Sequence, residues 1–209
     1  ESPACLDMDL LGKHLNALAR GEEIHLPRYN FVTRVQSGPI GRPMRLGKDE
    51  VAVCEGIHAL NDDIAAYCPD AFRLYISARS VVVDDDGHEV FKGTWMRLLR
   101  RLVRDSNFRG TPAAATLDMW ANVRRGEKRF ISPFKERANL MFDSSFPCEV
   151  SILKNYAAPL LAAVPEGAER YAEIRSILPA LERFETIDPA LLAPESMLRE
   201  FIGGGVYSY

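Results

Sequence analysis

Arginines are concentrated in residues 97–110, at a spacing that suits the binding of a phosphate group. Four of them recur at intervals of one and three residues: Arg97, Arg100, Arg101 and Arg104. On an α-helix, this spacing places four guanidinium groups on one face. Arg109 follows, in an expected polar turn closed by Gly110. Guanidinium is planar, forked and always charged, so it matches phosphate oxygens better than an ammonium group does. Two interpretations stay open, an anion site and a solvated helix face with salt bridges.

A candidate metal ligand follows an apolar run. Residues 51–54 are continuous Val-Ala-Val-Cys, and we expect a buried parallel strand there, with Cys54 as a buried free thiol. Glu55 ends this run. At the carboxyl end of such a strand, a carboxylate is placed to hold Mg²⁺ or to cap the next turn. His58, three residues on, is expected to be structural.

Two aromatic residues form a candidate ring-binding element. Tyr29 and Phe31 flank Asn30 in a segment where Pro27 argues against a central strand. Their rings could stack on a planar group such as a base, or could simply pack.

Two other stretches are expected to be turns. The acidic residues 84–87 lack the spacing of a calcium loop, so a solvated turn is favoured over a metal site. The glycines at 203–205 are expected to form a flexible or tight turn rather than a phosphate-binding loop. The 209 residues contain no Gly-x-x-x-x-Gly-Lys-Ser/Thr motif, the backbone cradle of P-loop enzymes.

The elements that must position these residues alternate between strands and helices. Besides residues 51–54, strands are predicted at 72–77 and 138–142. A first helix, capped by Ser2-Pro3, should end near Arg20, and the arginine helix should be capped by Thr94. Further helices are predicted from Thr111-Pro112 through Val123 to an end at residues 124–128, at 149–164, and at 168–184 with Pro179 interrupting it. Alternation of this kind predicts an α/β fold with a parallel sheet flanked by helices.

Composition limits the class of protein. The chain is 47% hydrophobic and 26% charged, with a net charge of −3, which does not favour a general nucleic-acid binder. It has no run of about 18 apolar residues, so no membrane partner is expected. The four cysteines are widely spaced and predict a reducing, cytoplasmic compartment.

Several motifs together resemble the uridine kinase and phosphoribulokinase family. Residues 53–58 (Val-Cys-Glu-Gly-Ile-His) are similar to its hydrophobic-Glu-Gly-Ile element, and residues 29–31 to its Tyr-Asp-Phe. Residues 100–110 resemble its lid pattern Arg-Arg-x-x-Arg-Asp-x-x-x-Arg-Gly, and residues 138–144 the strand after the lid. The end of the chain, residues 196–204, resembles the longer bacterial nucleoside-kinase branch.

This resemblance implies a P-loop-kinase-like fold that is incomplete at the N-terminus. Residues 1–145 would be a partial α/β core with an arginine lid at about 94–126, and residues 146–209 a helical extension packed on the same domain. The implied activity is transfer of the γ-phosphoryl of ATP to the 5′-hydroxyl of a uridine-like or cytidine-like nucleoside, with Mg²⁺. An incomplete sheet would leave an exposed edge, which predicts either a homodimer or a disordered segment at that edge.

The same resemblance implies roles for individual residues. Arg101, Arg104 and Arg109 would close over ATP and the acceptor and neutralise charge on the phosphoryl group, Arg104 and Arg109 also binding ATP. Glu55 would help to hold Mg²⁺. The substrate would be bound by Tyr29, Phe31 and Glu1.

Departures from the family pattern leave alternatives open. Thr111 stands where the family has a second lid arginine, and Asn30 where it has an aspartate. The P-loop and the catalytic aspartate of the family have no counterpart in these 209 residues, so the chain alone is expected to be inactive. The acceptor could be another small hydroxyl compound, as in phosphoribulokinase or pantothenate kinase. The chain could also be a non-catalytic nucleotide-binding or regulatory module.

Overall fold

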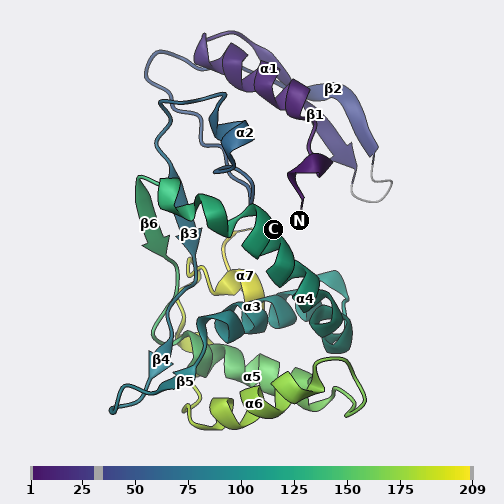
Figure 1. Cartoon of the computed structure of the whole chain (residues 1–209), viewed down its shortest axis with the longest axis vertical. Helices are drawn as coiled ribbons and strands as arrows, with labels where there is room; N and C mark the ends of the chain where they lie inside the picture. Colours follow the sequence, from purple (N-terminus) through teal and green to yellow (C-terminus); the bar gives the residue numbers. More distant parts are fainter. Residues whose placement is uncertain (1, 31–34, 208–209) are drawn as a thin grey trace. The chain divides into compact units, whose positions relative to one another are not determined.

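The computed structural model describes residues 2–30 and 35–207 (Figure 1). It divides into two compact units, the first formed by residues 1–75 and 126–141, the second by residues 76–125 and 142–209. Both units take their residues from two separate stretches of the chain. No helix in the described ranges is both long enough and apolar enough to cross a membrane.

The first unit begins with a short helix and a β-hairpin. A 3₁₀ turn, η1 (Pro3–Cys5), precedes helix α1 (Met8–Ala19), which Asp7 caps by accepting a hydrogen bond from the N–H of Leu10 at 3.0 Å. The α-helix therefore starts later than Ser2-Pro3 predicted, because Ser2 caps only the 3₁₀ turn. Strands β1 (Ile24–Asn30) and β2 (Val35–Met44) then pair antiparallel, beside α1 in Figure 1.

Short elements complete this unit. Helix α2 (Asp62–Ala65) is capped by Asn61, and the 3₁₀ helix η2 (Ser132–Arg137) is joined to it by an ion pair between Arg137 and Asp62. The Tyr67 hydroxyl donates to the carbonyl of Met8 at 3.2 Å. Its ring lies so close to Gly12 that a Cβ there would come within 2.4 Å of a ring carbon.

The predicted strand at residues 51–54 is wrong. These residues form no regular structure, and Val51 and Val53 are 85% and 89% exposed. Cys54 is likewise exposed, contrary to the prediction of a buried thiol. A strand needs a neighbour to pair its N–H and C=O groups and to cover its side chains. No strand in the part of the chain that the structure describes pairs with this run. Glu55 is therefore not held at the end of a strand.

The other two predicted strands do form a parallel pair. Strand β3 (Leu74–Ser77) runs beside β6 (Leu140–Asp143). The carbonyl of Arg73 accepts from the N–H of Leu140, and the carbonyl of Ser77 accepts from the N–H of Ser144, so both chains run in the same direction. The fold is thus α/β with a parallel sheet, as the strand and helix pattern predicted.

The second unit is a helical cluster around the arginine helix, α3 (Gly93–Arg109). Four residues predicted to anchor this helix, Leu98, Leu99, Leu102 and Val103, are completely buried. Helices α5 (Glu149–Ala162) and α7 (Arg199–Ile202) contact it, and α6 (Tyr171–Glu182) packs on α5 (Figure 1). Burial of these leucine- and isoleucine-rich faces is the main stabilising term of the unit.

Two predicted helix features are wrong. Lys92 rather than Thr94 precedes the arginine helix, and its side chain makes no capping bond. Helix α6 continues through Pro179, which was predicted to interrupt it. A proline removes one backbone donor, and burial of Ile177 and Leu181 on either side of it stabilises the helix against that loss. Helix α4 (Ala113–Phe130) ends two residues after the end predicted at residues 124–128.

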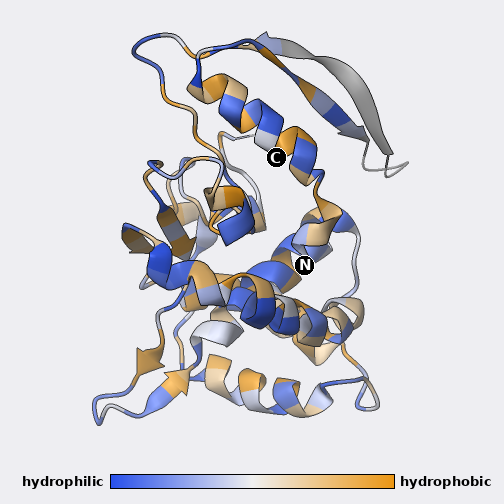
Figure 2. Ribbon diagram, turned by 45° about the horizontal axis from the view of Figure 1, so that its top comes forward, coloured by the Kyte–Doolittle hydropathy of each residue, from blue (hydrophilic) through white to orange (hydrophobic). Residues whose placement is uncertain are grey.

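Two further short elements belong to this unit. Strands β4 (Val82–Val83) and β5 (Glu89–Phe91) form an antiparallel hairpin, with apolar residues in the strands and hydrophilic ones in the turn (Figure 2). Phe91 at its end packs edge-to-face on Trp95 and Phe184. The 3₁₀ helix η3 (Pro189–Leu191) lies between α6 and α7 in the chain.

Candidate functional site: an arginine cluster beside the C-terminal turn

Three arginines of α3 gather on one buried carboxylate, that of Asp105. Arg104 binds its Oδ1 through Nη2 at 2.9 Å and Nε at 3.1 Å. The Nε of Arg101 lies 3.3 Å from Oδ2, and the Nη1 of Arg109 lies 3.3 Å from Oδ1. The Asp105 side chain is only 3% exposed. One carboxylate therefore holds the three arginines that the sequence singled out for phosphate binding.

The helix end places Arg109 within reach of this carboxylate. Gly110 has φ 59° and ends α3 in a left-handed conformation, so Arg109 is the last residue of the helix and not part of the predicted polar turn. The N–H of Gly110 and that of Thr111 both donate to the backbone carbonyl of Asp105. Arg109 thus stays on the last turn, one helical turn from Asp105.

Arg100 is separated from this cluster. It forms a two-pronged ion pair with Glu149 at the start of α5, and its Nη2 also donates to the carbonyl of Ser144 at 2.7 Å. The side chains of Arg100 and Glu149 are 11% and 0% exposed. The prediction of four guanidinium groups on one open face is therefore wrong at Arg100, because the helix packs on α5 along that side.

The arginine cluster has an excess of positive charge. Arg101, Arg104 and Arg109 carry three charges against one on Asp105. Arg101 and Arg104 are about one quarter exposed and Arg109 about half exposed, so ligand oxygens can reach them. Charge-assisted, forked hydrogen bonds to phosphate are the interaction that such a cluster offers.

A pocket of about 370 Å³ lies beside the cluster, within the second unit. Its α3 wall is formed by Arg104, Phe108 and Arg109, and its other wall comes from the end of the chain: Arg199, Glu200, Gly203, Gly204, Gly205 and Tyr207. Sequence reasoning assigned the glycines to a turn and gave Arg199 and Tyr207 no role. The turn is confirmed, since the N–H of Gly203 donates to the carbonyl of Arg199 at 2.7 Å.

The other predicted site residues belong to the first unit or lie outside the described residues. Tyr29 is on β1 and is 49% exposed. Glu55 is exposed in an irregular segment. Phe31 and Glu1 lie outside the described residues. A pocket of about 990 Å³ in this unit lies along α1 and β1 and is lined by residues that include His14, His25 and Tyr67, but Tyr29 is not one of its lining residues.

Glu55 meets the requirements of a magnesium site only in part. Mg²⁺ in phosphate-transferring sites is commonly bound by one or two carboxylates, the remaining ligands being water and phosphate oxygens. One exposed carboxylate can supply one such ligand. Among the described residues, Glu55 belongs to no group of three or more metal-ligating side chains.

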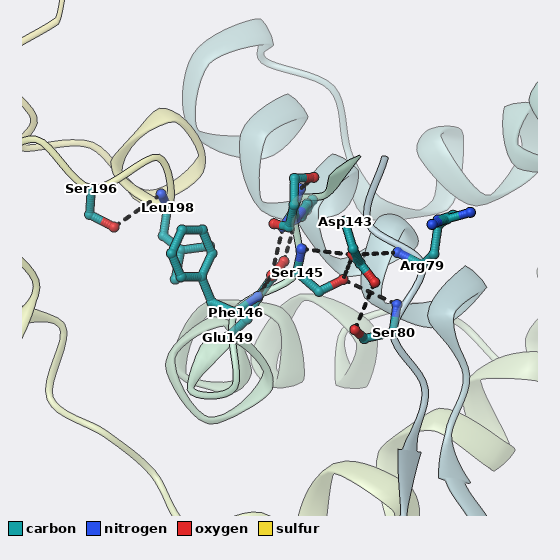
Figure 3. A network of polar contacts seen from close by, with 10 residues as sticks. Arg79, Ser80, Asp143, Ser145, Phe146, Glu149, Ser196 and Leu198 are labelled. Atoms are coloured by element: carbon teal, nitrogen blue, oxygen red, sulfur yellow. Dashed lines mark hydrogen bonds and ion pairs between the residues drawn. The ribbon is translucent and has the colours of Figure 1, made fainter. Parts of the chain in front are cut away.

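A polar cluster at the carboxyl ends of β3 and β6 was not predicted (Figure 3). The Asp143 carboxylate accepts hydrogen bonds from the N–H groups of Arg79 and Ser145 and from the hydroxyls of Ser145 and Ser80, at 2.7 to 3.0 Å. Burial opposes its ionisation, but these bonds outweigh burial and lower its pKa from 3.8 to about 2. The sequence signal was an Asp-Ser-Ser run directly after a strand.

The acidic turn of the β4–β5 hairpin brings three potential metal ligands together. Single ligand atoms of Asp84, Asp86 and His88 lie within 4.8 Å of one another. Asp84 already accepts a hydrogen bond from the N–H of His88 at 2.8 Å and lies 3.7 Å from a guanidinium nitrogen of Arg183. These contacts fit the solvated turn that the sequence favoured.

Comparison with known proteins places the chain in a family. The model of the phosphoribulokinase / uridine kinase family matches residues 1–150. A uridine kinase of Bacillus pumilus is 28% identical over 153 residues, which cover 73% of this chain and 64% of that protein. Uridine kinases of Oceanobacillus iheyensis and Halobacterium salinarum are 29% identical over 153 and 142 residues, covering 73% and 68% of this chain.

The match to these relatives leaves part of them uncovered. The chain spans 64% of the Oceanobacillus protein and 55% of the Halobacterium protein. The lid pattern at residues 100–110 lies inside the matched range, whereas Arg199 and the C-terminal turn lie beyond it. With its family model matched over 150 of 209 residues, the chain belongs to the phosphoribulokinase / uridine kinase family.

Proposed function

We propose that this protein acts in transfer of the γ-phosphoryl group of ATP to the 5′-hydroxyl of a pyrimidine nucleoside such as uridine or cytidine. The observation that carries the proposal is the gathering of Arg101, Arg104 and Arg109 on Asp105. Family membership and relatives named uridine kinase support the same chemistry.

The transfer itself needs little covalent work from the protein. A bond forms between the 5′-oxygen and the γ-phosphorus, the bond from that phosphorus to the β–γ bridging oxygen breaks, and ADP leaves while the hydroxyl proton passes to a base. Catalysis is mainly positioning and stabilisation of negative charge. In the proposal, Arg101, Arg104 and Arg109 supply that stabilisation, and Arg104 and Arg109 also bind ATP.

The remaining roles are proposed for residues of the first unit. Tyr29, with Phe31 and Glu1, would bind the nucleoside, and Glu55 would supply one oxygen ligand to Mg²⁺. The magnesium ion would neutralise phosphate charge when bound. The four cysteines are free thiols, which supports a reducing, cytoplasmic location. We also propose a homodimer, because β3 and β6 pair only with each other among the described strands and so both are edges.

A second candidate function is favoured by one observation. The 209 residues contain no Gly-x-x-x-x-Gly-Lys-Ser/Thr, so the chain supplies no P-loop backbone to hold the ATP phosphates. A nucleotide-binding or regulatory module that does not catalyse transfer would keep the arginine cluster without this motif. We propose that the 209-residue chain on its own does not catalyse phosphoryl transfer from ATP to a nucleoside.

Calorimetric titration and a transfer assay test these proposals together. The purified chain is titrated separately with Mg·ATP and with uridine. It is then incubated with both, and the formation of radiolabelled uridine phosphate is measured. We expect both ligands to bind at micromolar to millimolar strength, Arg104→Ala to remove ATP binding, and no steady transfer. Steady phosphorylation of a nucleoside would disprove the inactive-chain proposal, and absence of uridine binding would contradict the nucleoside assignment.

The control for this experiment is an arginine outside the cluster. Arg175 is exposed on α6 in the same unit and is not a pocket residue. Arg175→Ala should leave both titrations unchanged. A panel of other hydroxyl acceptors, including a sugar phosphate and pantothenate, tests whether uridine is preferred.

A further inference from the structure

The C-terminal turn is held firmly against the arginine helix. The Nδ2 of Asn107 on α3 donates to the backbone carbonyl of Phe201 on α7 at 3.0 Å. The Phe201 ring is buried, and the guanidinium of Arg100 lies 5.2 Å from its centre. The pocket between α3 and the end of the chain therefore has two walls that are fixed to one another.

Arg199 joins the turn that follows α7 to the segment that precedes it. Its Nη1 donates to the carbonyl of Gly203 at 3.4 Å, and its Nη2 donates to the carbonyls of Pro189 and Leu192 at 3.0 and 2.8 Å. Beyond the turn, the N–H of Val206 donates to the carbonyl of Pro194 at 3.1 Å. These residues lie after position 150, so the matched family model assigns them nothing.

The glycines allow the backbone to line the pocket closely. Gly203 and Gly204 have φ of 86° and 73°, which side-chain-bearing residues rarely adopt. At Gly205, a Cβ would lie 2.9 Å from the Cβ of Arg199. Within the described residues, the N–H groups of Gly204 and Gly205 donate no hydrogen bond. Successive N–H groups of a turn are a recurrent anion-binding element.

Aromatic rings at the same pocket add a second kind of contact. Phe108 on α3 and Tyr207 after the turn both line it and are 57% and 59% exposed. The Phe108 ring reaches Gly203, since a Cβ there would lie 3.4 Å from a ring carbon. Half-exposed rings beside guanidinium groups suit a planar base attached to a phosphate.

From this combination, we infer that the C-terminal turn, residues 203–207, is the second wall of a nucleotide pocket. The phosphate groups are bound by Arg104 and Arg109 with the N–H groups of Gly204 and Gly205, and the base stacks on Phe108 and Tyr207. The volume of about 370 Å³ is within the range of small-ligand sites. The inference rests on the proposed function for Arg104 and Arg109, and adds a recognition element outside the matched range.

Two probes separate the phosphate contacts from the base contacts. The full chain is titrated with inorganic tripolyphosphate and with ATP, both without uridine. We expect ATP to bind about tenfold more tightly, because stacking of one base supplies a difference of this order. Arg109→Gln should weaken both probes about tenfold, since it removes a charge-assisted hydrogen bond.

The turn itself is tested at Tyr207. Tyr207→Ser, at a largely exposed position, should weaken ATP five- to tenfold and leave tripolyphosphate unchanged. Phe72→Ser removes an exposed ring of the first unit and should change neither titration, and Arg175→Gln is the matched control for Arg109→Gln.

The outcomes separate this inference from the proposed function. Equal ATP binding by the parent and Tyr207→Ser would overturn the stacking role of the turn. Failure of tripolyphosphate to bind, or its binding unchanged in Arg109→Gln, would overturn the pocket. Uridine binding and transfer are read in separate experiments, so they can fail or succeed independently of these results.

Discussion

Arg100 and Glu149 form an ion pair that is almost completely buried between α3 and α5. The pair also reaches the carbonyl of Ser144, and Glu149 accepts from the N–H of Phe146 at 3.2 Å. Arg100 thus joins α3 to α5 and to the segment after β6, whereas the arginine cluster on the same helix can be reached by ligands. Removing one partner would leave the other charge buried and unpaired.

The first prediction concerns this pair. Arg100→Met should lower the free energy of unfolding by about 3–5 kcal/mol, because the buried Glu149 carboxylate loses the guanidinium with which it is paired. Urea denaturation measures the change. Arg175→Met is the surface control and should shift the free energy by less than about 0.5 kcal/mol. The double variant Arg100→Met/Glu149→Leu should recover part of the loss, and a double variant no more stable than Arg100→Met would argue against the buried-charge explanation.

The second prediction concerns Asp143 and pH. Its pKa is lowered to about 2 in the folded chain from an ordinary 3.8. A lowered carboxyl pKa stabilises the fold above about pH 4, and that stabilisation is lost as the pH falls from about 4 toward 2. Because Asp143 is exposed, solvent screening limits the contribution of its ionisation to the free energy of unfolding to about 1 kcal/mol. Asp143→Asn should cost this amount at pH 7.

Stability measured between pH 2 and pH 7 checks this prediction. The difference between parent and Asp143→Asn should shrink as the pH falls through the window from about 4 to 2. Asp118→Asn removes an exposed carboxylate of α4 and serves as the control. A difference that stays constant down to pH 2 would exclude Asp143 ionisation as its source.

The third prediction concerns the turn at Gly205. Gly205→Ala should destabilise by about 1–3 kcal/mol, because the added methyl group lies 2.9 Å from the Cβ of Arg199 and 3.2 Å from the carbonyl oxygen of Pro194. Gly167→Ala is the matched control, since a Cβ there meets nothing within 4 Å. It should be neutral or stabilise by up to about 1 kcal/mol. Thermal unfolding of both variants gives the comparison, and equal effects would refute the steric account.

The fourth prediction concerns Asp105. Asp105→Asn should destabilise by about 2 kcal/mol, because three guanidinium groups then repel one another without a carboxylate between them. Sulfate should restore stability more in this variant than in the parent, at ionic strength matched with chloride. In the double variant Asp105→Asn/Arg109→Gln, sulfate should restore less stability than in Asp105→Asn alone. If sulfate raised both proteins equally, the three arginines would not be acting as an anion site.

The fifth prediction concerns self-association. The strand pair exposes apolar side chains, with Leu74 43%, Ile76 55% and Phe142 55% exposed. Unpaired edges with apolar side chains invite pairing with a second copy. Light scattering should show a concentration-dependent dimer that Ile76→Lys weakens, while Leu191→Lys, also at an exposed site, leaves it unchanged. A parent chain that stays monomeric at high concentration would contradict this prediction.

The sequence predicted best where periodicity and end signals agreed. The arginine helix has a 3.6-residue apolar pattern and a glycine at its end, and both its buried face and its closure at Gly110 are confirmed. The strand predicted at residues 51–54 was wrong because an apolar run does not show whether a neighbouring strand exists. The interruption predicted at Pro179 was wrong because packing of α6 outweighs one missing hydrogen bond.

The site was predictable in part for a similar reason. Residue type and spacing identified Arg101, Arg104 and Arg109, which are close together along one helix. They could not identify Arg199 or Tyr207, some 90 to 100 positions away, because nothing local relates those residues to α3. The inward turn of Arg100 likewise depends on Glu149, 49 positions away along the chain.

The excess of arginine over aspartate at Asp105 also makes the charge distribution of the molecule uneven. The chain has a net charge of −3, and the arginine cluster with Asp105 carries +2, so the remaining residues together carry −5. Long-range attraction and chromatographic retention depend on such local fields rather than on net charge alone. A sulfated resin such as immobilised heparin should therefore retain this acidic protein at neutral pH and low salt, through the arginine cluster.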